Sequence, residues 1–188
     1  MKGLLCIVLL AAACGGSSSS AVVRAHVTGT VDGQPFAAHD SAALVVKRTG
    51  TNPTVALLVS NLSDSCAGND GNRANKQVLS IGITAFTGGL DAGSFPVYNS
   101  ASGDAPSGTE AIVEYHSSND TCQGTTPPNT LGSQGRVTLD SMSLDADGGL
   151  KGSFDVILQN GDRLKGTFDA PICPDKSDAG VTADAGCR

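Results

Sequence analysis

The sequence predicts an all-β fold, either an antiparallel β-sandwich or a flattened barrel of about eight to ten strands. Three observations lead to this prediction. Between residues 24 and 173, apolar residues recur with the period of two that turns one face of a strand toward a core. The apolar runs are short and are separated by Gly, Asn, Asp and Pro. Outside the apolar run within residues 1–13, no segment carries the apolar stripe of an amphipathic helix, so we expect no substantial helix in the rest of the chain.

The first pair of strands is predicted at residues 27–31 and 34–38. They flank Asp32-Gly33, a dipeptide typical of the two-residue type I′ turn that joins antiparallel strands. A turn of that length places Gly29 opposite Phe36. The aromatic ring can then cover a position at which glycine contributes no side chain.

The next strands are of three kinds. Residues 42–46 and 55–59 are apolar on both faces, which predicts central strands that are covered from both sides. Residues 79–85 and 110–115 alternate apolar with polar or small residues and are predicted to be half-buried. Residues 95–98 contain a proline, which lacks the amide hydrogen that a central strand donates, so this segment is predicted at a sheet edge.

The strand predicted around residues 137–144 changes parity. Its apolar residues occupy odd positions at first and even positions later. One extra residue near Asp140-Ser141, a β-bulge, brings four apolar residues to one face: Val137, Leu139, Met142 and Leu144.

An internal near-repeat predicts the last hairpin. Residues 150–155 and 164–169 both read Leu-Lys-Gly-Ser/Thr-Phe-Asp, with apolar residues or glycine at the even positions. Both arms can turn their even positions inward only if the loop has three residues, 159–161, with Gly161 in the left-handed conformation. This register sets each phenylalanine opposite a glycine of the other arm, Phe154 with Gly166 and Phe168 with Gly152.

The N-terminus is typical of an export signal. Residues 1–13 have a basic start and an apolar run too short to span a bilayer as a helix, which needs about 20 residues. Ala11 and Ala13 fit the small-x-small rule of ordinary secretion, and the same residues before Cys14 resemble the bacterial lipobox. We therefore expect a lipoprotein signal peptide, with Cys14 lipidated by palmitate-type acyl chains; a plainly secreted protein is the alternative.

The expected organisation after the signal has three parts. Residues 14–23 contain the lipidated cysteine and a Gly/Ser tether, residues 24–173 form the β-sandwich domain, and residues 174–188 are an acidic low-complexity tail with too little apolar surface to fold alone. Gly15 follows the cysteine, and by resemblance to Gram-negative lipoproteins this implies a lipid anchor in the cell outer membrane, on its periplasmic or its surface face.

The number of cysteines favours lipidation. Cys6 lies in the discarded signal, and five cysteines would remain, an odd number for an oxidising compartment. Lipidation of Cys14 leaves four. Of the three possible pairings we expect two disulfides, Cys66 with Cys122 and Cys173 with Cys187. Zinc binding is the alternative, but the chain has no Cys-x-x-Cys pair.

No spacing of reactive side chains predicts catalysis, a metal or a cofactor. The histidines are scattered, although His26 and His39 could meet beside Asp40; the third is His116. Residues 145–149 and 69–72 resemble fragments of calcium loops, but Asp-Gly is also ordinary turn chemistry. The nucleophile motifs Gly-x-Ser-x-Gly and Ser-x-x-Lys and the zinc motif His-Glu-x-x-His are absent from the sequence.

Composition limits the partners. The formal net charge of −6 disfavours nucleic acid, and a chain without tryptophan lacks the strongest aromatic platform for carbohydrate. With 188 residues the chain has room for one ordinary domain, which we expect to be monomeric. The expected partner is membrane lipid, through acylated Cys14.

Several of these features together resemble a known group of proteins. They are the lipobox, the serine tether, Val-x-Gly-Thr-Val-Asp-Gly at 27–33, and Gly-Ser-Phe-Asp followed by Gly-Thr-Phe-Asp-Ala-Pro before Cys173. The chain thus resembles the uncharacterised outer-membrane lipoproteins that are abundant in myxobacteria-type genomes. The resemblance implies an envelope location and a β-sandwich-like domain, and it supplies no site residues.

Two functions are left open by the sequence. The first is a membrane-anchored envelope lipoprotein that acts as a non-enzymatic binding or structural module. The alternative is a cell-envelope hydrolase or a protein that binds a small ligand or carbohydrate, with a site assembled from loops such as 63–76 and 99–107. A pocket that gathers His116, Glu114 or Asp120 beside a hydroxyl group would favour the alternative.

Overall fold

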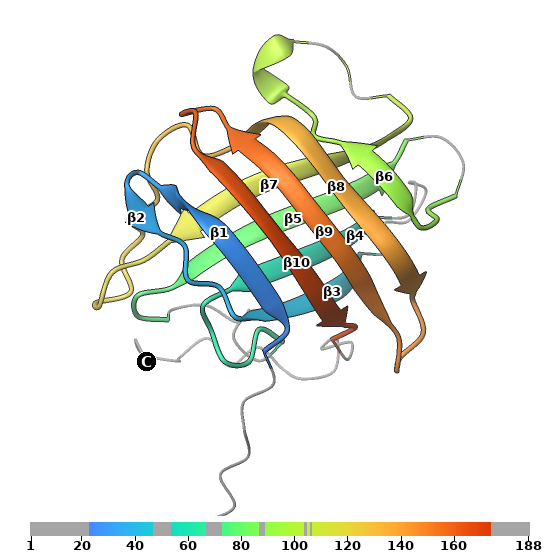
Figure 1. Cartoon of the computed structure of the whole chain (residues 1–188), viewed down its shortest axis with the longest axis horizontal. Helices are drawn as coiled ribbons and strands as arrows, with labels where there is room; N and C mark the ends of the chain where they lie inside the picture. The colour runs from blue at the N-terminus through green and yellow to red at the C-terminus, as the bar shows by residue number, and fades with distance from the viewer. Residues whose placement is uncertain are drawn as a thin grey trace, which may run out of the picture.

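Two antiparallel β-sheets lie face to face, and the strands of one cross those of the other (Figure 1). The computed structural model describes residues 23–46, 54–66, 73–86, 89–103, 105 and 107–173. In this part of the chain the strands are β1 (Ala25–Val31), β2 (Gln34–Pro35), β3 (Asp40–Val46), β4 (Thr54–Ser60), β5 (Gln77–Ala85), β6 (Gly93–Pro96), β7 (Thr109–Ser117), β8 (Gly132–Ser143), β9 (Gly149–Leu158) and β10 (Arg163–Pro171). The predicted all-β sandwich is therefore confirmed.

The first sheet has six strands in the order β2-β1-β10-β9-β8-β6, and the second has four in the order β3-β4-β5-β7. The proline-containing strand β6 forms one edge of the six-stranded sheet, as predicted, because Pro96 cannot donate to a further neighbour. Among the described residues, helical structure is limited to one 3₁₀ turn, η1 (Ser100–Ser102), and no helix there is long and apolar enough to cross a membrane.

The core lies between the two sheets and is built by strand alternation. Away from the strand ends, every second residue of β4, β5 and β7 is buried, as in the rows Val55–Ile83–Ala111 and Leu57–Ile81–Val113. Tyr115 extends this face and meets the edge of the Phe36 ring at 5.6 Å between ring centroids, and burial raises the pKa of its phenol. Each fully buried Val, Leu or Ile contributes about 1.5–3 kcal/mol to folding.

The last hairpin has the predicted register. Val156 lies opposite Leu164, Phe154 opposite Gly166, and Gly152 opposite Phe168. Gly161 has a φ of 90°, and its N–H donates to the carbonyl of Leu158 over 2.9 Å. The three-residue loop thus keeps the apolar faces of β9 and β10 in the core, which a two-residue loop would not.

The turn of the first hairpin is also confirmed, but its second strand, predicted at residues 34–38, is limited to β2 (Gln34–Pro35). Asp32 and Gly33 have φ values of 50° and 74°, the positive values that a type I′ turn requires at both positions. The N–H of Phe36 donates to the carbonyl of Gly29 over 3.2 Å, which sets the two residues opposite one another. Phe36 is 2% exposed, so this ring belongs to the core.

The predicted bulge lies in β8. Its register with β9 passes from Leu139–Gly152 directly to Ser141–Lys151, which leaves Asp140 unpaired. Met142 consequently packs against the core. Leu144 does not, since it follows the end of β8 and is 38% exposed.

The prediction of two central strands was wrong for β3. β4 is central, but β3 is the edge of the four-stranded sheet. Its apolar character has another cause, because the chain beyond β10 runs along it. Ala43 forms a bridge with Ile172, and the N–H of Cys173 donates to the carbonyl of Ala43 over 2.8 Å. This contact covers the free edge that a lone apolar strand would expose.

A substitution at Gly166 tests the pairing of phenylalanine with glycine in the last hairpin. A Cβ at this position would lie 2.7 Å from the Phe154 ring and 2.6 Å from the carbonyl oxygen of His26. We expect Gly166→Ala to lower the free energy of unfolding by about 1–3 kcal/mol, measured by urea denaturation. Gly124→Ala is the matched control, because a Cβ there meets nothing within 4 Å. Equal stability of the two variants would contradict the close packing of Phe154 on Gly166.

Candidate functional site

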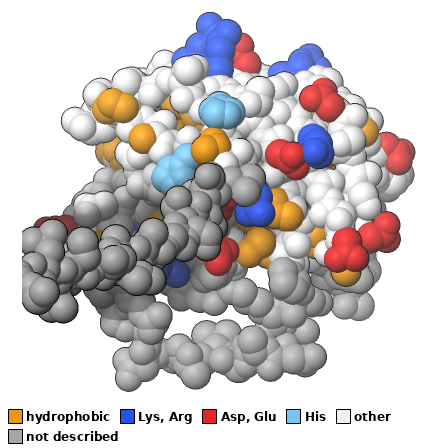
Figure 2. Space-filling view, turned by 60° about the horizontal axis from the view of Figure 1, so that its bottom comes forward, with side chains coloured by type: hydrophobic (Ala, Val, Ile, Leu, Met, Phe, Trp, Pro, Cys, Tyr) orange, Lys and Arg blue, Asp and Glu red, His pale blue; other side chains and the backbone are white. Residues whose placement is uncertain are grey.

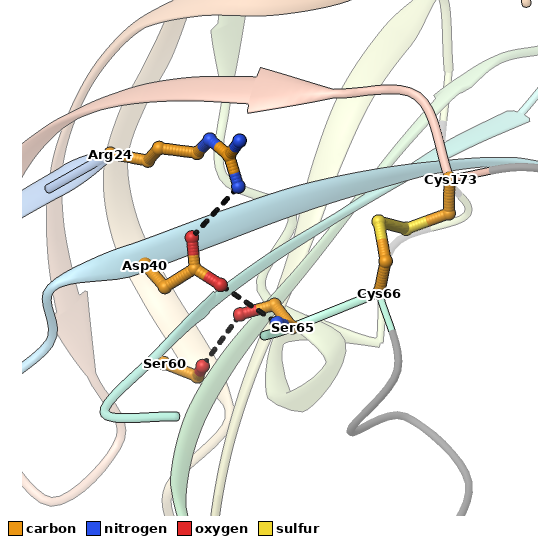
Figure 3. Close-up of a disulfide and its surroundings, with 6 residues drawn as sticks. All are labelled: Arg24, Asp40, Ser60, Ser65, Cys66 and Cys173. Atoms are coloured by element: carbon orange, nitrogen blue, oxygen red, sulfur yellow. Dashed lines mark hydrogen bonds and ion pairs between the residues drawn. A yellow bond between two sulfur atoms is a disulfide. The ribbon is translucent and has the colours of Figure 1, made fainter. Parts of the chain in front are cut away.

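The two sheets are joined covalently at the β3 edge. A disulfide links Cys66, in the loop after β4, to Cys173, just beyond β10, with 5.4 Å between their Cα atoms (Figure 3). We call this disulfide, together with the Ala43–Ile172 bridge and the hydrogen bond from Cys173 to Ala43, the seam. It connects the six-stranded sheet to the four-stranded sheet.

Both predicted disulfide pairings were wrong. Cys66 does not pair with Cys122, and Cys173 does not pair with Cys187, because Cys66 and Cys173 are bonded to each other. The cause is the path of the chain after β10, which follows β3 and brings Cys173 beside the loop after β4. Cys122 is also disulfide-bonded. Residues 1–22 and 174–188, and with them Cys14 and Cys187, lie outside the described residues.

A buried polar cluster lies beside the disulfide (Figure 3). Asp40, at the start of β3, is 2% exposed, and its Oδ2 accepts a hydrogen bond of 2.7 Å from the N–H of Ser65. Its Oδ1 lies 3.6 Å from Nη1 of Arg24. The hydroxyl oxygens of Ser60 and Ser65 are 2.8 Å apart, and Ser60 Oγ also accepts from the N–H of Leu62 over 3.1 Å. These bonds fix the loop that carries Cys66.

A hollow of about 230 Å³, the first hollow, opens next to this cluster. Apolar side chains of β4, β5 and the loop after β4 line part of it, namely Leu58, Val78 and Leu62. Ser60, Ser65 and Ser80 contribute hydroxyl groups, and Lys76 and His116 contribute nitrogen atoms. The hollow therefore combines apolar surface with hydrogen-bonding groups and one permanent positive charge.

A second hollow, also of about 230 Å³, adjoins the first. It shares Lys76 and His116 with the first hollow and adds Arg73 and Cys122. Cys122 has a φ of 61°, and its turn is held by Asn119, whose Oδ1 accepts from the N–H groups of Thr121 and Gln123. Basic side chains thus gather where the two hollows meet, in a chain whose net charge is −6.

His116 faces a carboxylate in this site. Its Nε2 lies 3.3 Å from Oε2 of Glu114, two residues earlier on β7. In the described part of the chain, no hydrogen bond joins His116 to a serine, and the Ser60 and Ser65 hydroxyls bond each other. The arrangement lacks the contact between nucleophile and base that hydroxyl activation needs.

The other histidines do not assemble a metal site with their neighbours. His26 is on β1 opposite Thr167, while Nδ1 of the exposed His39 lies 3.4 Å from the carbonyl oxygen of Ala37. Among the described residues, no three His, Cys, Asp or Glu side chains come together as a metal would require.

The structure describes only one of the two segments that resemble fragments of calcium loops. The one at 145–149 contains a turn between β8 and β9, in which the N–H of Gly148 donates to the carbonyl of Asp145 over 2.8 Å. Residues 69–72 lie outside the described residues.

The outer faces of the two sheets differ in character. On the six-stranded sheet, Arg163 donates two hydrogen bonds of 2.7 Å to the carboxylate of Asp155. Nζ of Lys165 lies 2.9 Å from the same carboxylate. The hydrogen bonds from Arg163, and then from Lys165, hold the pKa of Asp155 well below its usual range. The four-stranded sheet instead carries an outward row without charge, which consists of Leu44, Ala56, Gly82 and Ile112.

The end of the molecule at which β1 begins and β10 ends is turned forward in Figure 2. Acidic and basic side chains are interspersed there, and hydrophobic side chains gather in small, separate groups. Histidine side chains are exposed on this face. The visible part of this surface is therefore mixed in character.

Comparison of the chain with protein-family models, with curated proteins and with solved structures gave no match. The site is therefore interpreted from its own residues. Sequence reasoning singled out His116 and Glu114, which the structure brings together, but it missed Arg24, Ser65 and Lys76. Asp40 was the available signal, since a carboxylate that opens an otherwise apolar strand must find partners when it is buried.

A substitution at Asp40 tests whether the buried polar cluster stabilises the fold. Asp40→Ala leaves the N–H of Ser65 without its acceptor in a buried position, and we expect a loss of about 1–3 kcal/mol in the free energy of unfolding. Urea denaturation at neutral pH measures this loss. The control is Asp169→Ala, which removes the exposed ion pair of 2.7 Å with Lys151 and should cost about 0–1 kcal/mol. A neutral effect of Asp40→Ala would show that the cluster does not hold the loop.

Proposed function

We propose that this chain is a lipoprotein of the bacterial cell envelope, anchored in the outer membrane through acylated Cys14, whose β-sandwich acts as a non-enzymatic binding or structural module. The signal peptide at 1–13 and the tether at 14–23 are parts of this proposal. The partner it names is membrane lipid, which the acyl chains enter.

The observation that carries the proposal is the state of the cysteines. Cys66, Cys122 and Cys173 are all disulfide-bonded, although they lie in three different loops. Structural disulfides persist in oxidising compartments such as the bacterial periplasm and the cell surface. An exported domain is therefore favoured, and export agrees with the apolar N-terminal run that ends at Cys14.

The position of the first strand supports a tether. β1 begins at Ala25, only eleven residues after Cys14, and residues 15–20 are glycine and serine alone. A Gly/Ser composition is typical of the linkers that join a folded domain to its anchor.

The alternative, a hydrolase or a small-ligand protein, has one observation in its favour. The first hollow places Lys76 and His116 beside three serine hydroxyls. Hydrolysis is disfavoured, because His116 faces Glu114 and the hydroxyls of Ser60 and Ser65 bond each other. Binding without chemistry fits this geometry better than nucleophilic attack does.

The mass of the mature N-terminus tests the anchor. With the full chain expressed in a Gram-negative host, we expect the first residue to be Cys14 carrying the mass of two or three acyl chains, and the protein to sediment with the outer membrane. Cys14→Ser should release it into the soluble envelope fraction, because serine has no thiol to which the lipid can be attached and the membrane-binding acyl chains are lost.

Ser17→Ala is the matched control, because it alters the tether without altering the acylated residue. An unmodified Cys14 in a protein that is nevertheless membrane-bound would refute lipidation. A soluble wild-type protein with a free Cys14 would refute the anchor altogether.

A further inference from the structure

The first hollow lies on the outer face of the four-stranded sheet, as strand parity requires. In β4 and β5 the odd-numbered residues, such as Leu57 and Leu79, are buried in the core. The even-numbered residues of these strands therefore face outward, and Leu58, Val78 and Ser80 line the hollow. Its floor thus includes two apolar side chains and a hydroxyl group.

The loop after β4 forms a wall of this hollow, to which Leu62 and Ser65 contribute. A hydrogen bond of 2.7 Å from the N–H of Ser65 to the buried Asp40 holds the loop. The disulfide of the seam holds it again at Cys66. A wall that is already fixed favours binding, because a ligand then loses little affinity to the ordering of the loop.

The place where the two hollows meet is cationic. Lys76 and His116 line both hollows, and Arg73 lines the second. In the part of the chain that the structure describes, no carboxylate lies within ion-pair distance of Nζ of Lys76, and this residue is only partly buried. Glu114 faces His116, over 3.3 Å. The ammonium group of Lys76 can therefore receive an anion.

We propose that the first hollow binds a small organic anion, with a short apolar chain on Leu58, Leu62 and Val78 and a carboxylate at Lys76. Entry of the chain removes apolar surface from water, and the carboxylate neutralises the ammonium group. This inference rests on the proposed function, because it takes the β-sandwich to be a binding module and names the chemical class of its ligand.

The volume of the hollow limits the size of the ligand. About 230 Å³ is less than the roughly 300–1,000 Å³ of pockets for drug-sized molecules. A water molecule occupies about 30 Å³ in the liquid, so the hollow has space for roughly eight atoms other than hydrogen. Hexanoate has about this size and combines a carboxylate with an apolar chain. A membrane lipid, with its much longer chains, would not fit.

Other classes of ligand match the lining less well. A purely apolar molecule would cover Ser80 and Lys76 without giving either a partner, which costs free energy. An anion without a chain would leave Leu58 and Val78 in contact with water. Carbohydrate is disfavoured as well, since among the described residues no Phe or Tyr side chain lines the hollow.

Titration with hexanoate, followed through the amide NMR signals of the isotope-labelled protein, tests the site. The protein is the full chain carrying Cys14→Ser, so that no acyl chain competes for the hollow. We expect saturable shifts at Leu62, Lys76 and Val78, and none at Ser153 on the other sheet. Acetate lacks the apolar chain and hexanol lacks the charge, so each should bind at least about five-fold more weakly. Acetate that binds as well as hexanoate would overturn the apolar contact.

A substitution at Lys76 tests the carboxylate contact. Lys76→Met keeps an unbranched side chain but removes the charge, and we expect hexanoate to bind about five-fold more weakly while hexanol binds unchanged. Lys151→Met is the matched control, because Lys151 lies exposed on the six-stranded sheet and pairs with Asp169. Equal affinity of Lys76→Met and the parent chain for hexanoate would overturn the assignment of the carboxylate to Lys76.

A second measurement needs no substitution in the hollow and serves if Lys76→Met does not fold. Raising the ionic strength from about 0.01 M to about 1 M shortens the Debye length from about 30 Å to about 3 Å. Hexanoate should then bind several-fold more weakly, whereas hexanol should not. Binding of hexanoate that does not change with salt would contradict the charge contact.

Failure of this site and failure of the anchor are distinguishable. If hexanoate shifts no signal near Lys76, or shifts only signals of the six-stranded sheet, the proposed ligand site is overturned. Acylation of Cys14 is measured on a different protein, the wild type, and stands independently of that result. Conversely, a free Cys14 would refute the anchor and leave the titration unaffected.

Discussion

The seam between β3 and the end of β10 is the constraint on which the rest of the architecture depends. The chain leaves the six-stranded sheet at Pro171 and at once joins the edge of the other sheet through the Ala43–Ile172 bridge. The Cys66–Cys173 disulfide makes this contact covalent across a sequence separation of 107 residues. The buried bonds of Asp40 and Ser65 then hold the loop in which Cys66 lies. Consequently one short region positions the two sheets and the first hollow.

The features that the sequence predicted correctly are those set by local parity and turn chemistry. A three-residue loop ending in Gly161, a type I′ turn at Asp32-Gly33 and a bulge at Asp140 each follow from which residues must face inward. Errors arose where two distant segments meet. Residues 42–46 looked central because they are apolar, but their cover comes from Ile172 and Cys173, a contact that no local pattern encodes.

The disulfide pairing and the residues of the candidate site could not be predicted from the sequence for the same reason: both depend on which distant loops lie together. Cys66 and Cys122 occupy similar loops after strands, and similarity of surroundings suggested a pair, whereas pairing depends on which loops lie together. Lys76 and Ser65 have no diagnostic spacing, so their convergence with His116 became visible only through the order β4-β5-β7. His116 and Glu114, which were named only as residues that a pocket could gather, lie together because two residues of a strand that are two apart share a face.

The two outer faces of the domain carry different side chains. The six-stranded sheet presents ion pairs such as Asp155 with Arg163, which keep that face hydrated, while the four-stranded sheet presents an uncharged row and the hollows near Lys76. Two hydrogen-bonded sheets joined by a covalent seam would suit the binding or structural module that we propose.

The most direct test of the seam is the unfolding free energy of the Cys66→Ala/Cys173→Ala variant in urea, with Cys122 left intact. A disulfide that closes a loop of roughly 100 residues contributes about 4.7 kcal/mol in the chain-entropy model, and removal of a native disulfide typically costs about 2–5 kcal/mol. We predict a loss within that range. A variant that unfolds within about 0.5 kcal/mol of the wild type, the range of an ordinary surface substitution, would contradict the central role of the seam.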